Sequence, residues 1–198
     1  MEPDHTQRGP GRPVVTSHAE IEQAAFRLFD RRGYDGTTLS DIADAVGVGR
    51  RTLFRYYRSK NDIPWGQFDR TLVDFRSLLD SMPSDLPLRD TIRWGILVFN
   101  DFPAGGAPSH SERMRLILET PALQAHSSLR YAEWRAVISD FVARRLEIPV
   151  HHVLPQTVGH VSLALAMSPY GQWLFRPDDS LIRLLQESMN SLETYLQI

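Results

Sequence analysis

A run of basic side chains between residues 50 and 60 is the clearest chemical feature of the sequence. The run consists of Arg50, Arg51, Arg55, Arg58 and Lys60, and no acidic residue interrupts it. Arginine can bind guanine O6 and N7 through two parallel hydrogen bonds, and both Arg and Lys neutralise phosphates. The run therefore indicates contact with a nucleic acid, with a solvated basic surface as the alternative.

The charge of the whole chain is distributed unevenly. Its 198 residues include 22 Lys and Arg against 24 Asp and Glu, a net charge of −2. Residues 1–60 hold ten basic and eight acidic side chains, a balance of +2, which leaves twelve against sixteen, or −4, in residues 61–198. A polyanion is therefore attracted to the first third of the chain and repelled by the remainder.

The residues around the basic run carry the start and stop signals of a helix-turn-helix. A first helix begins at a capping box formed by Ser17 and Glu20, and a second begins at another formed by Thr38 and Asp41. The second helix ends at Gly47, and a third helix begins after only two further residues and carries the basic run. In DNA-binding proteins with this arrangement, the second helix of the pair enters the major groove.

The third helix has one face for packing and one for DNA. Leu53 and Tyr57 are four residues apart and are expected to pack inward. The residues expected to contact DNA are Arg50, Arg51, Thr52, Arg55 and Tyr56 on this helix, with Thr38 and Lys60 at the starts of the flanking helices. Residues 1–15, rich in Gly and Pro, are expected to form a flexible arm whose Arg12 follows the minor groove.

The segment from Thr37 to Lys60, TTLSDIADAVGVGRRTLFRYYRSK, resembles the DNA-binding signature of the tetracycline-repressor (TetR) family. The resemblance implies a homodimeric, ligand-responsive repressor that binds a palindromic operator in double-stranded DNA. It places these residues on family DNA-contact positions: Thr38, Arg51, Thr52, Phe54, Tyr56 and Lys60. Phe54 stands where the family usually has Tyr, so it lacks the hydroxyl that would bind a phosphate.

Later segments resemble a narrower branch of the same family, the regulators associated with mycofactocin biosynthesis clusters of actinobacteria. These segments are KNDIPWGQFD at residues 60–69, ERMRLIL at 112–118, PAL at 121–123 and YAEWR at 131–135.

Apolar residues beyond the basic run recur at helical spacing between prolines, and no segment alternates as a strand does. One helix is expected to run from a cap at Ser59 and Asp62 to about Asp80. The sequence predicts an all-α fold of about nine helices, with a DNA-binding domain at residues 16–62. Residues 63–198 are predicted to form a helical ligand-binding and dimerisation domain.

The larger domain is rich in aromatic residues, which indicate either an ordinary core or an apolar ligand pocket. The predicted pocket residues are Trp94, Phe99, Phe102, Arg113, Met114, Ile117, Tyr131, Trp134 and Met167. Nearby basic side chains would suit an anionic head group: Arg113, Arg115, Arg130 and Arg135. Together with the resemblance, these residues favour an acyl-coenzyme A as the effector, with an aromatic or redox-cofactor-like molecule as the second candidate.

Two C-terminal helices are predicted to form a four-helix dimer interface, with packing inside the chain as the alternative. One helix has small residues on one face, Gly159, Ser162 and Ala166, which allow close approach of a second helix. The last helix has an apolar stripe formed by Leu181, Leu185, Met189 and Leu192.

The sequence gives no support for catalysis. It contains no cysteine, no Ser-His-acid spacing, no glycine-rich phosphate loop and no metal-ligand set, since His18 and Glu22 share a helix face without a third ligand. We therefore expect no enzyme activity, cofactor or metal; the competing interpretation is a non-catalytic helical carrier of small molecules, or a helical enzyme. Without a membrane-length apolar run or a secretory h-region, the chain is expected to be cytoplasmic and to have no membrane partner.

Overall fold

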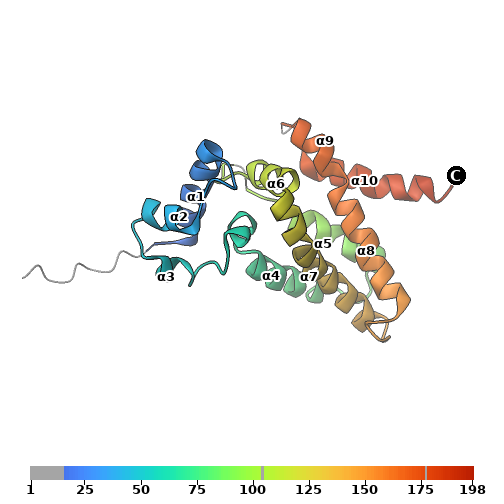
Figure 1. Cartoon of the computed structure of the whole chain (residues 1–198). Coiled ribbons are helices and arrows are strands. Elements are labelled where there is room, and N and C mark those ends of the chain that lie inside the picture. The colour runs from blue at the N-terminus through green and yellow to red at the C-terminus, as the bar shows by residue number, and fades with distance from the viewer. Residues whose placement is uncertain (1–15, 104, 177) are drawn as a thin grey trace, which may run out of the picture. The chain divides into compact units, whose positions relative to one another are not determined.

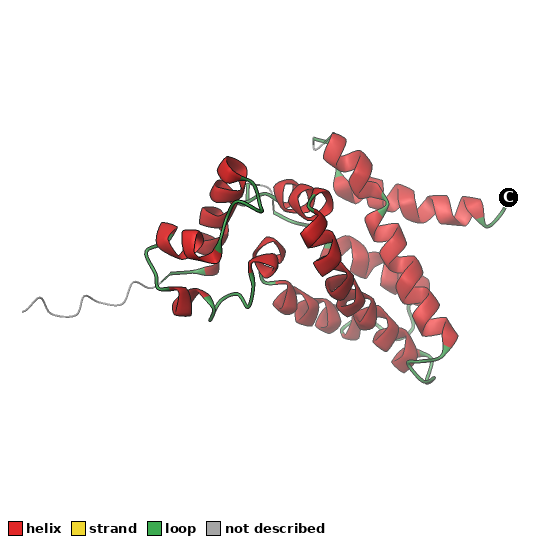
Figure 2. Cartoon of the chain, viewed as in Figure 1, coloured by secondary structure: helices red, strands yellow, loops and turns green. Residues whose placement is uncertain are grey.

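A computed structural model describes residues 16–103, 105–176 and 178–198. The regular secondary structure of these residues consists of ten α-helices and one 3-10 helix, which confirms the prediction of an all-α fold (Figure 2). The chain divides into two compact units, Met1–Ile63 and Pro64–Ile198. No helix within the described residues is both long and apolar enough to cross a membrane.

The described residues of the first unit contain three α-helices: α1 (His18–Arg32), α2 (Leu39–Ala45) and α3 (Arg50–Leu53) (Figure 1). Both predicted capping boxes are present. The Ser17 and Thr38 hydroxyls each accept a hydrogen bond from the N–H of the residue three positions later, and each residue donates its own N–H to that residue's carboxylate. The core of the unit is formed by Ile21, Ala25, Ile42, Leu53 and Tyr57, each of them at most 3% exposed.

Helix α3 is shorter than predicted. The sequence indicated a helix through Tyr57, but the backbone tightens after Leu53. Arg55 and Tyr56 donate their N–H groups to the carbonyls three residues earlier, at 3.1 and 2.9 Å. These two i→i+3 hydrogen bonds tighten the backbone into a turn after the α-helix, and the Tyr57 N–H also donates to the Leu53 carbonyl, at 3.1 Å.

The predicted helix from Ser59 to Asp80 is broken into two. A 3-10 helix, η1 (Lys60–Trp65), is followed by α4 (Phe68–Asp80). Pro64 has no N–H to donate, and Gly66 has a φ of +60°, which interrupts the helical path.

The second unit is built around α7, which at 25 residues is the longest helix described. Its helices after α4 are α5 (Leu88–Phe99), α6 (His110–Glu119), α7 (Pro121–Arg145), α8 (Val153–Met167), α9 (Pro169–Phe175) and α10 (Leu181–Tyr195). Helix α7 packs against α4, α5, α6 and α8. The core contains Phe75, Ile96, Trp134, Ile138 and Leu185.

The small residues of α8 pack inside the chain, so the prediction that they form the dimer interface is wrong. A Cβ at Gly159 would lie 2.5 Å from Ser139 Oγ and 3.1 Å from the carbonyl oxygen of Arg135, both on α7. Ser162 and Ala166 are each only 5% exposed. Small side chains here let α8 approach α7 closely, and they offer almost no surface to a second copy.

The apolar stripe of α10 is likewise buried within the chain. Leu181, Leu185 and Met189 are at most 7% exposed and belong to the core of the second unit. The interface prediction is therefore wrong for these three residues, because α10 uses them to cover α5, α8 and α9. Leu192 is only partly buried, and its place in an interface stays a prediction.

Candidate functional site

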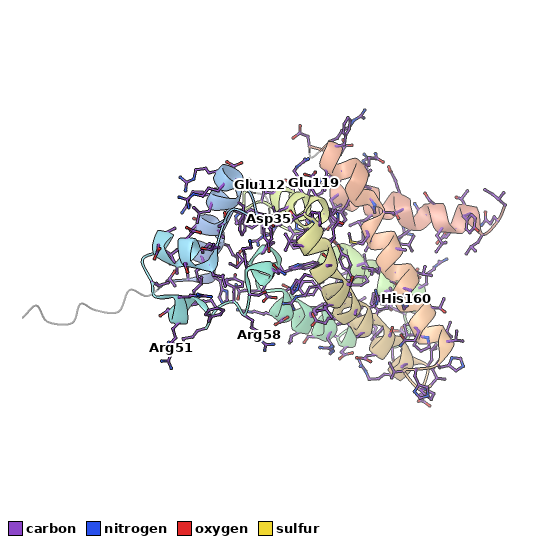
Figure 3. All side chains as sticks on the ribbon, in the orientation of Figure 1. Asp35, Arg51, Arg58, Glu112, Glu119 and His160 are labelled. Atoms are coloured by element: carbon purple, nitrogen blue, oxygen red, sulfur yellow. The ribbon has the colours of Figure 1, made fainter. Side chains whose placement is uncertain are left out.

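The basic surface of the first unit is formed by α3 and the turn after it. Arg50, Arg51, Arg55 and Arg58 are exposed, and Figure 3 shows Arg51 and Arg58 extending away from the ribbon. None of these four has an acidic partner among the described residues. Unpaired guanidinium groups close together attract a polyanion strongly, because they carry no local counter-charge.

The opposite face of α3 fixes it to the unit, as the sequence indicated. Leu53 is 1% exposed and Tyr57 is 3% exposed. Phe54 instead points outward at 43% exposure, and the Arg50 guanidinium lies 5.5 Å from the centroid of its ring. Phe54 therefore supports an arginine of the basic surface by a cation–π contact, a role that needs no hydroxyl.

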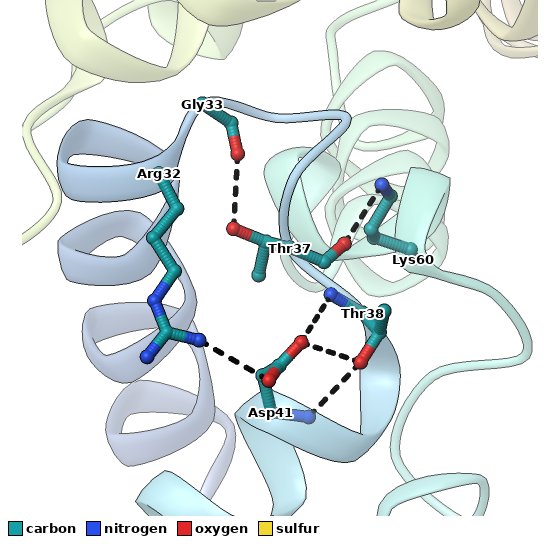
Figure 4. Close-up of polar contacts among 6 residues, drawn as sticks. All are labelled: Arg32, Gly33, Thr37, Thr38, Asp41 and Lys60. Carbon is teal, nitrogen blue, oxygen red and sulfur yellow. Dashed lines mark hydrogen bonds and ion pairs between the residues drawn. The ribbon is translucent and has the colours of Figure 1, made fainter.

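Thr38, at the start of α2, is exposed but already hydrogen-bonded (Figure 4). Its hydroxyl donates to Asp41 Oδ2 at 2.5 Å, its N–H donates to the same oxygen at 2.8 Å, and Arg32 is ion-paired with Asp41 at 3.2 Å. The hydrogen bonds from Thr38, with Arg32 nearby, hold the pKa of the Asp41 carboxyl below its usual value. The predicted contact of Thr38 with phosphate stays a prediction.

Lys60 has an internal role that sequence reasoning did not find. Its Nζ donates to the carbonyl oxygens of Tyr34 and Thr37, at 2.8 and 2.9 Å, and lies 4.1 Å from the centroid of the Tyr34 ring. Burial lowers the pKa of this ammonium group. Lys60 thus fixes the turn between α1 and α2, and one of its three hydrogens is left for the predicted phosphate contact.

The two tyrosines after α3 bind α1 and the residues before it. Tyr56 donates to the carbonyl of Thr16 at 2.6 Å, and Tyr57 donates to Glu22, which is only 7% exposed. The ring of His18 meets both phenol rings edge-on, at 5.0 and 5.1 Å. Glu22 and His18 are therefore part of the packing that positions α3, which their spacing on α1 alone did not reveal.

Thr16, the first residue described, is fixed beside the basic surface by Tyr56. Arg12 of the predicted arm lies outside the described residues, so its contact with the minor groove stays a prediction.

The second unit contains a continuous cluster of aromatic rings on η1, α4, α5 and α7. Its members are Trp65, Phe68, Phe75, Phe99, Tyr131 and Trp134, with neighbouring centroids between 4.9 and 6.5 Å apart. Phe99, Tyr131 and Trp134 were predicted pocket residues. The structure brings them together and buries Met114 and Ile117 in the adjoining core, with Met167 at its edge.

Two other predicted pocket residues lie at the surface. Trp94 is 44% exposed, opposite the buried Ile92 and Ile96 on α5, so the prediction that it lines an interior pocket is wrong. Phe102 is 40% exposed and stacks on the ring of His110, with the centroids 3.7 Å apart.

A chain of buried polar groups joins α5, α6 and α9. The Tyr170 hydroxyl donates to Asn100 Oδ1 at 3.0 Å and lies 2.8 Å from His110 Nε2. Because the phenol has only one hydrogen, His110 Nε2 must be the donor to Tyr170. Burial, with the Arg113 guanidinium nearby, lowers the pKa of His110 from its usual 6.5 to about 4, so the ring is neutral at pH 7.

Three of the four arginines predicted to bind an anion are held by partners of the second unit, Arg135 being the exception. Arg113 donates to the carbonyl of Pro64 at 3.2 Å, and Arg115 donates to that of Leu174 at 2.6 Å. Arg130 is ion-paired with Asp69 at 2.7 Å and Glu133 at 3.1 Å. An anionic ligand would have to share these side chains or displace a partner.

Comparisons with known proteins match both units. Residues 21–63 match the family described as bacterial regulatory proteins, tetR family, and residues 86–197 match the MftR C-terminal domain. A Mycobacterium tuberculosis protein described as a mycofactocin biosynthesis transcriptional regulator, MftR, is 44% identical, and the match covers 91% of each chain. The regulator TcmR of Streptomyces glaucescens is 26% identical, over 96% of this chain and 90% of its own.

Solved structures of such regulators share the fold. The fatty acid degradation regulator FadR of Bacillus halodurans has a TM-score of 0.60 at 13% identity, covering 88% of this chain and 96% of its own. Thermus thermophilus FadR, solved with lauroyl-CoA, has a TM-score of 0.55 at 20% identity, covering 88% and 92%.

The neutral state of His110 predicts a loss of stability in mild acid. Because its pKa is lower in the folded chain than in the unfolded chain, unfolding takes up a proton below pH 6.5. The contribution of neutral His110 to the free energy of unfolding should be fully present above about pH 6.5. It should be lost as the pH falls toward about 4, which lowers the free energy of unfolding by up to about 3 kcal/mol. Urea unfolding across this pH range measures the effect.

The control is His110→Gln, whose amide donates to Tyr170 without titrating. Its free energy of unfolding should decline less between pH 6.5 and pH 4, and an identical decline in both proteins would contradict the assignment.

Proposed function

The chain belongs to the TetR family of bacterial transcriptional regulators, and on that premise we propose that it is a repressor whose α3 reads a palindromic operator and which a small molecule releases. Domain roles follow the two units: DNA binding for the first, effector binding and dimerisation for the second. A repressor of bacterial genes acts in the cytoplasm.

The observation that carries the DNA-binding proposal is the unpaired basic surface of α3. Arg50, Arg51 and Arg55 are exposed beside a helix that Leu53 and Tyr57 fix in place. A helical carrier or helical enzyme would have no need for this surface. Only the repressor hypothesis requires an affinity for duplex DNA that falls steeply with salt. The salt dependence of DNA binding therefore distinguishes a repressor from a helical carrier or enzyme.

Replacing a base-reading arginine should weaken operator binding without unfolding the protein. Operator fragments are first selected from a random pool of duplexes, and gel-shift titrations then compare the wild type with Arg51→Ala and Arg55→Ala. Each variant should lose about 1–3 kcal/mol, or about five- to 150-fold, and tolerate more bases at one position. Arg31→Ala, an exposed arginine on α1, is the matched control. Wild-type affinity in both α3 variants would refute the assignment.

We place the dimer interface on the outward face of α8. Val153, Leu154 and Val161 are 71%, 45% and 37% exposed there, next to exposed Thr157 and Ala164. The helix VLPQTVGHVSLALAM contains no Asp, Glu, Lys or Arg. A surface helix without these residues is typical of a buried interface, since interface centres are depleted of charge. Leu192 on the neighbouring α10 is proposed to extend it.

A charge on this face should separate the subunits. Val161→Arg is expected to be monomeric in analytical ultracentrifugation and to lose most of its operator affinity, because two half-sites must be bound together. Ala125→Arg places the same charge at an exposed position of α7 and should remain dimeric. If Val161→Arg stays a dimer with full operator affinity, the interface lies elsewhere.

We propose an acyl-coenzyme A as the effector, with an aromatic or redox-cofactor-like molecule as the second candidate. The aromatic cluster of the second unit offers an apolar environment for an acyl chain, and Arg113 and Arg130 lie beside it. Two proteins of this fold support the choice: FadR of Thermus thermophilus, solved with lauroyl-CoA, and FadR of Bacillus subtilis, solved with stearoyl-CoA. Release requires that the ligand bind the DNA-incompetent state more tightly.

Operator release should depend on chain length. Operator-bound protein is titrated with acetyl-, octanoyl-, lauroyl- and palmitoyl-CoA, and release should strengthen along the series as more apolar surface is buried. Free coenzyme A is the control and should have no effect. If no member of the series releases the operator, this class of effector is ruled out.

A further inference from the structure

Two polar atoms inside the aromatic cluster have no partner. The indole N–H of Trp65 and the hydroxyl of Tyr131 are buried, and neither forms a hydrogen bond within the described residues. Their rings lie 5.7 Å apart and nearly perpendicular, at 77°. Because buried donors are almost always paired, two unpaired donors on adjacent rings call for an explanation.

The surrounding polar groups do not supply that partner. Ser127 lies close enough to Tyr131 to act against the rise that burial causes in the Tyr131 pKa. Its hydroxyl, however, donates its one hydrogen to the carbonyl of Leu123 at 2.7 Å, and the Tyr131 hydroxyl forms no hydrogen bond with it. The nearby Tyr170 is in contrast fully engaged, with His110 and Asn100.

The chemistry of the two donors defines the missing group. An indole N–H can only donate, and a phenol hydroxyl with no acceptor beside it needs one. A carbonyl or carboxylate oxygen has two lone pairs and can accept from both at once. The neighbouring rings of the cluster are apolar. The Phe68 ring centroid lies 5.1 Å from that of Trp65, and the Phe99 centroid lies 6.5 Å from that of Phe68.

We propose that Trp65 Nε1 and Tyr131 Oη bind the acyl carbonyl or carboxylate oxygen of the effector, with its hydrocarbon chain among Phe68, Phe99 and Trp134. This assignment rests on the proposed function and specifies the polar subsite of its ligand. The oxygen belongs either to a thioester or to a free fatty acid, and both present the same acceptor to this pair.

The position of Trp65 in the chain links the proposed subsite to the DNA-binding unit. Trp65 is the last residue of η1, the segment through which the chain passes from the first unit to the second. Arg113 holds the carbonyl of the preceding Pro64 at 3.2 Å. A ligand that hydrogen-bonds Trp65 therefore acts directly on the segment that connects effector binding to the DNA-binding unit.

Tyr131→Phe tests the proposal, because it removes only the hydroxyl. Full-length wild type and variant are titrated with lauroyl-CoA, with S-dodecyl-CoA, which has the same head and chain but a thioether in place of the carbonyl, and with lauric acid. Affinity is measured by thermal shift and by release of the operator. The wild type should prefer lauroyl-CoA or lauric acid to S-dodecyl-CoA, and Tyr131→Phe should reduce that preference about three- to ten-fold. Trp65→Phe should reduce it similarly.

Stability of the ligand-free protein supplies an independent readout. Tyr131→Phe should melt at the wild-type temperature or above it, because an unpaired buried hydroxyl is removed. Tyr170→Phe, which breaks a satisfied chain, should melt lower and keep the preference for a carbonyl. A response to lauric acid alone identifies a free acid, and a response to lauroyl-CoA alone identifies a thioester; both support the subsite.

Three results would overturn the assignment. One is equal affinity of the wild type for thioester and thioether; another is an unchanged preference in Tyr131→Phe. The third is the absence of any thermal shift with all three probes, which would leave the pair to hold a buried water only. If the coenzyme A species fail to release the operator while lauric acid still binds in a Tyr131-dependent manner, the proposed effector fails and the subsite stands.

Discussion

A helix of four residues cannot hold its own conformation in water, so the basic surface depends on the burial of two side chains. One turn of helix gains too few hydrogen bonds to offset the entropy of forming it. Helix α3 is fixed instead by Leu53 and Tyr57, which insert into the core of the first unit. The Tyr57 hydroxyl adds a hydrogen bond to the buried Glu22, so α1 also sets the position of α3. With two residues buried in this way, the arginines between and beside them are left exposed.

In the second unit, the packing depends on the close approach of α7 and α8. Gly159 brings α8 against the backbone of α7, where any larger side chain would meet Ser139 and Arg135. The contact frees the opposite face of α8, on which Val153, Leu154 and Val161 remain exposed. Gly159 thus helps to determine which face of α8 packs against α7 and which face stays exposed.

Local signals in the sequence predicted the helix starts of the first unit well, but they did not predict which distant residues pack together. Capping boxes at Ser17 and Thr38 were found because each involves residues only three positions apart. The spacing of Gly159, Ser162 and Ala166 correctly indicated close helix contact, but spacing does not say whether the contacting helix belongs to the same chain. Lys60 was likewise visible as a basic residue, while the carbonyls it binds lie 23 and 26 positions earlier. Trp94 was misplaced for the same reason: an aromatic residue suits an interior position, but the sequence does not show that this side chain lies on the exposed face of α5.

The arginines of α3 and the turn after it carry no local counter-charge, whereas several arginines of the second unit do. Within the described residues, ion-paired arginines of the second unit include Arg89, Arg115, Arg130, Arg144 and Arg183. Most of these pairs are exposed and contribute little to stability, but each cancels a positive charge locally. On α3 and the turn after it, no described acid cancels the four arginines. Salt screens such an uncompensated surface within about 8–10 Å, so DNA affinity that depends on it must fall steeply with ionic strength. Positive charge at α3 therefore follows less from the number of its arginines than from the absence of acids beside them.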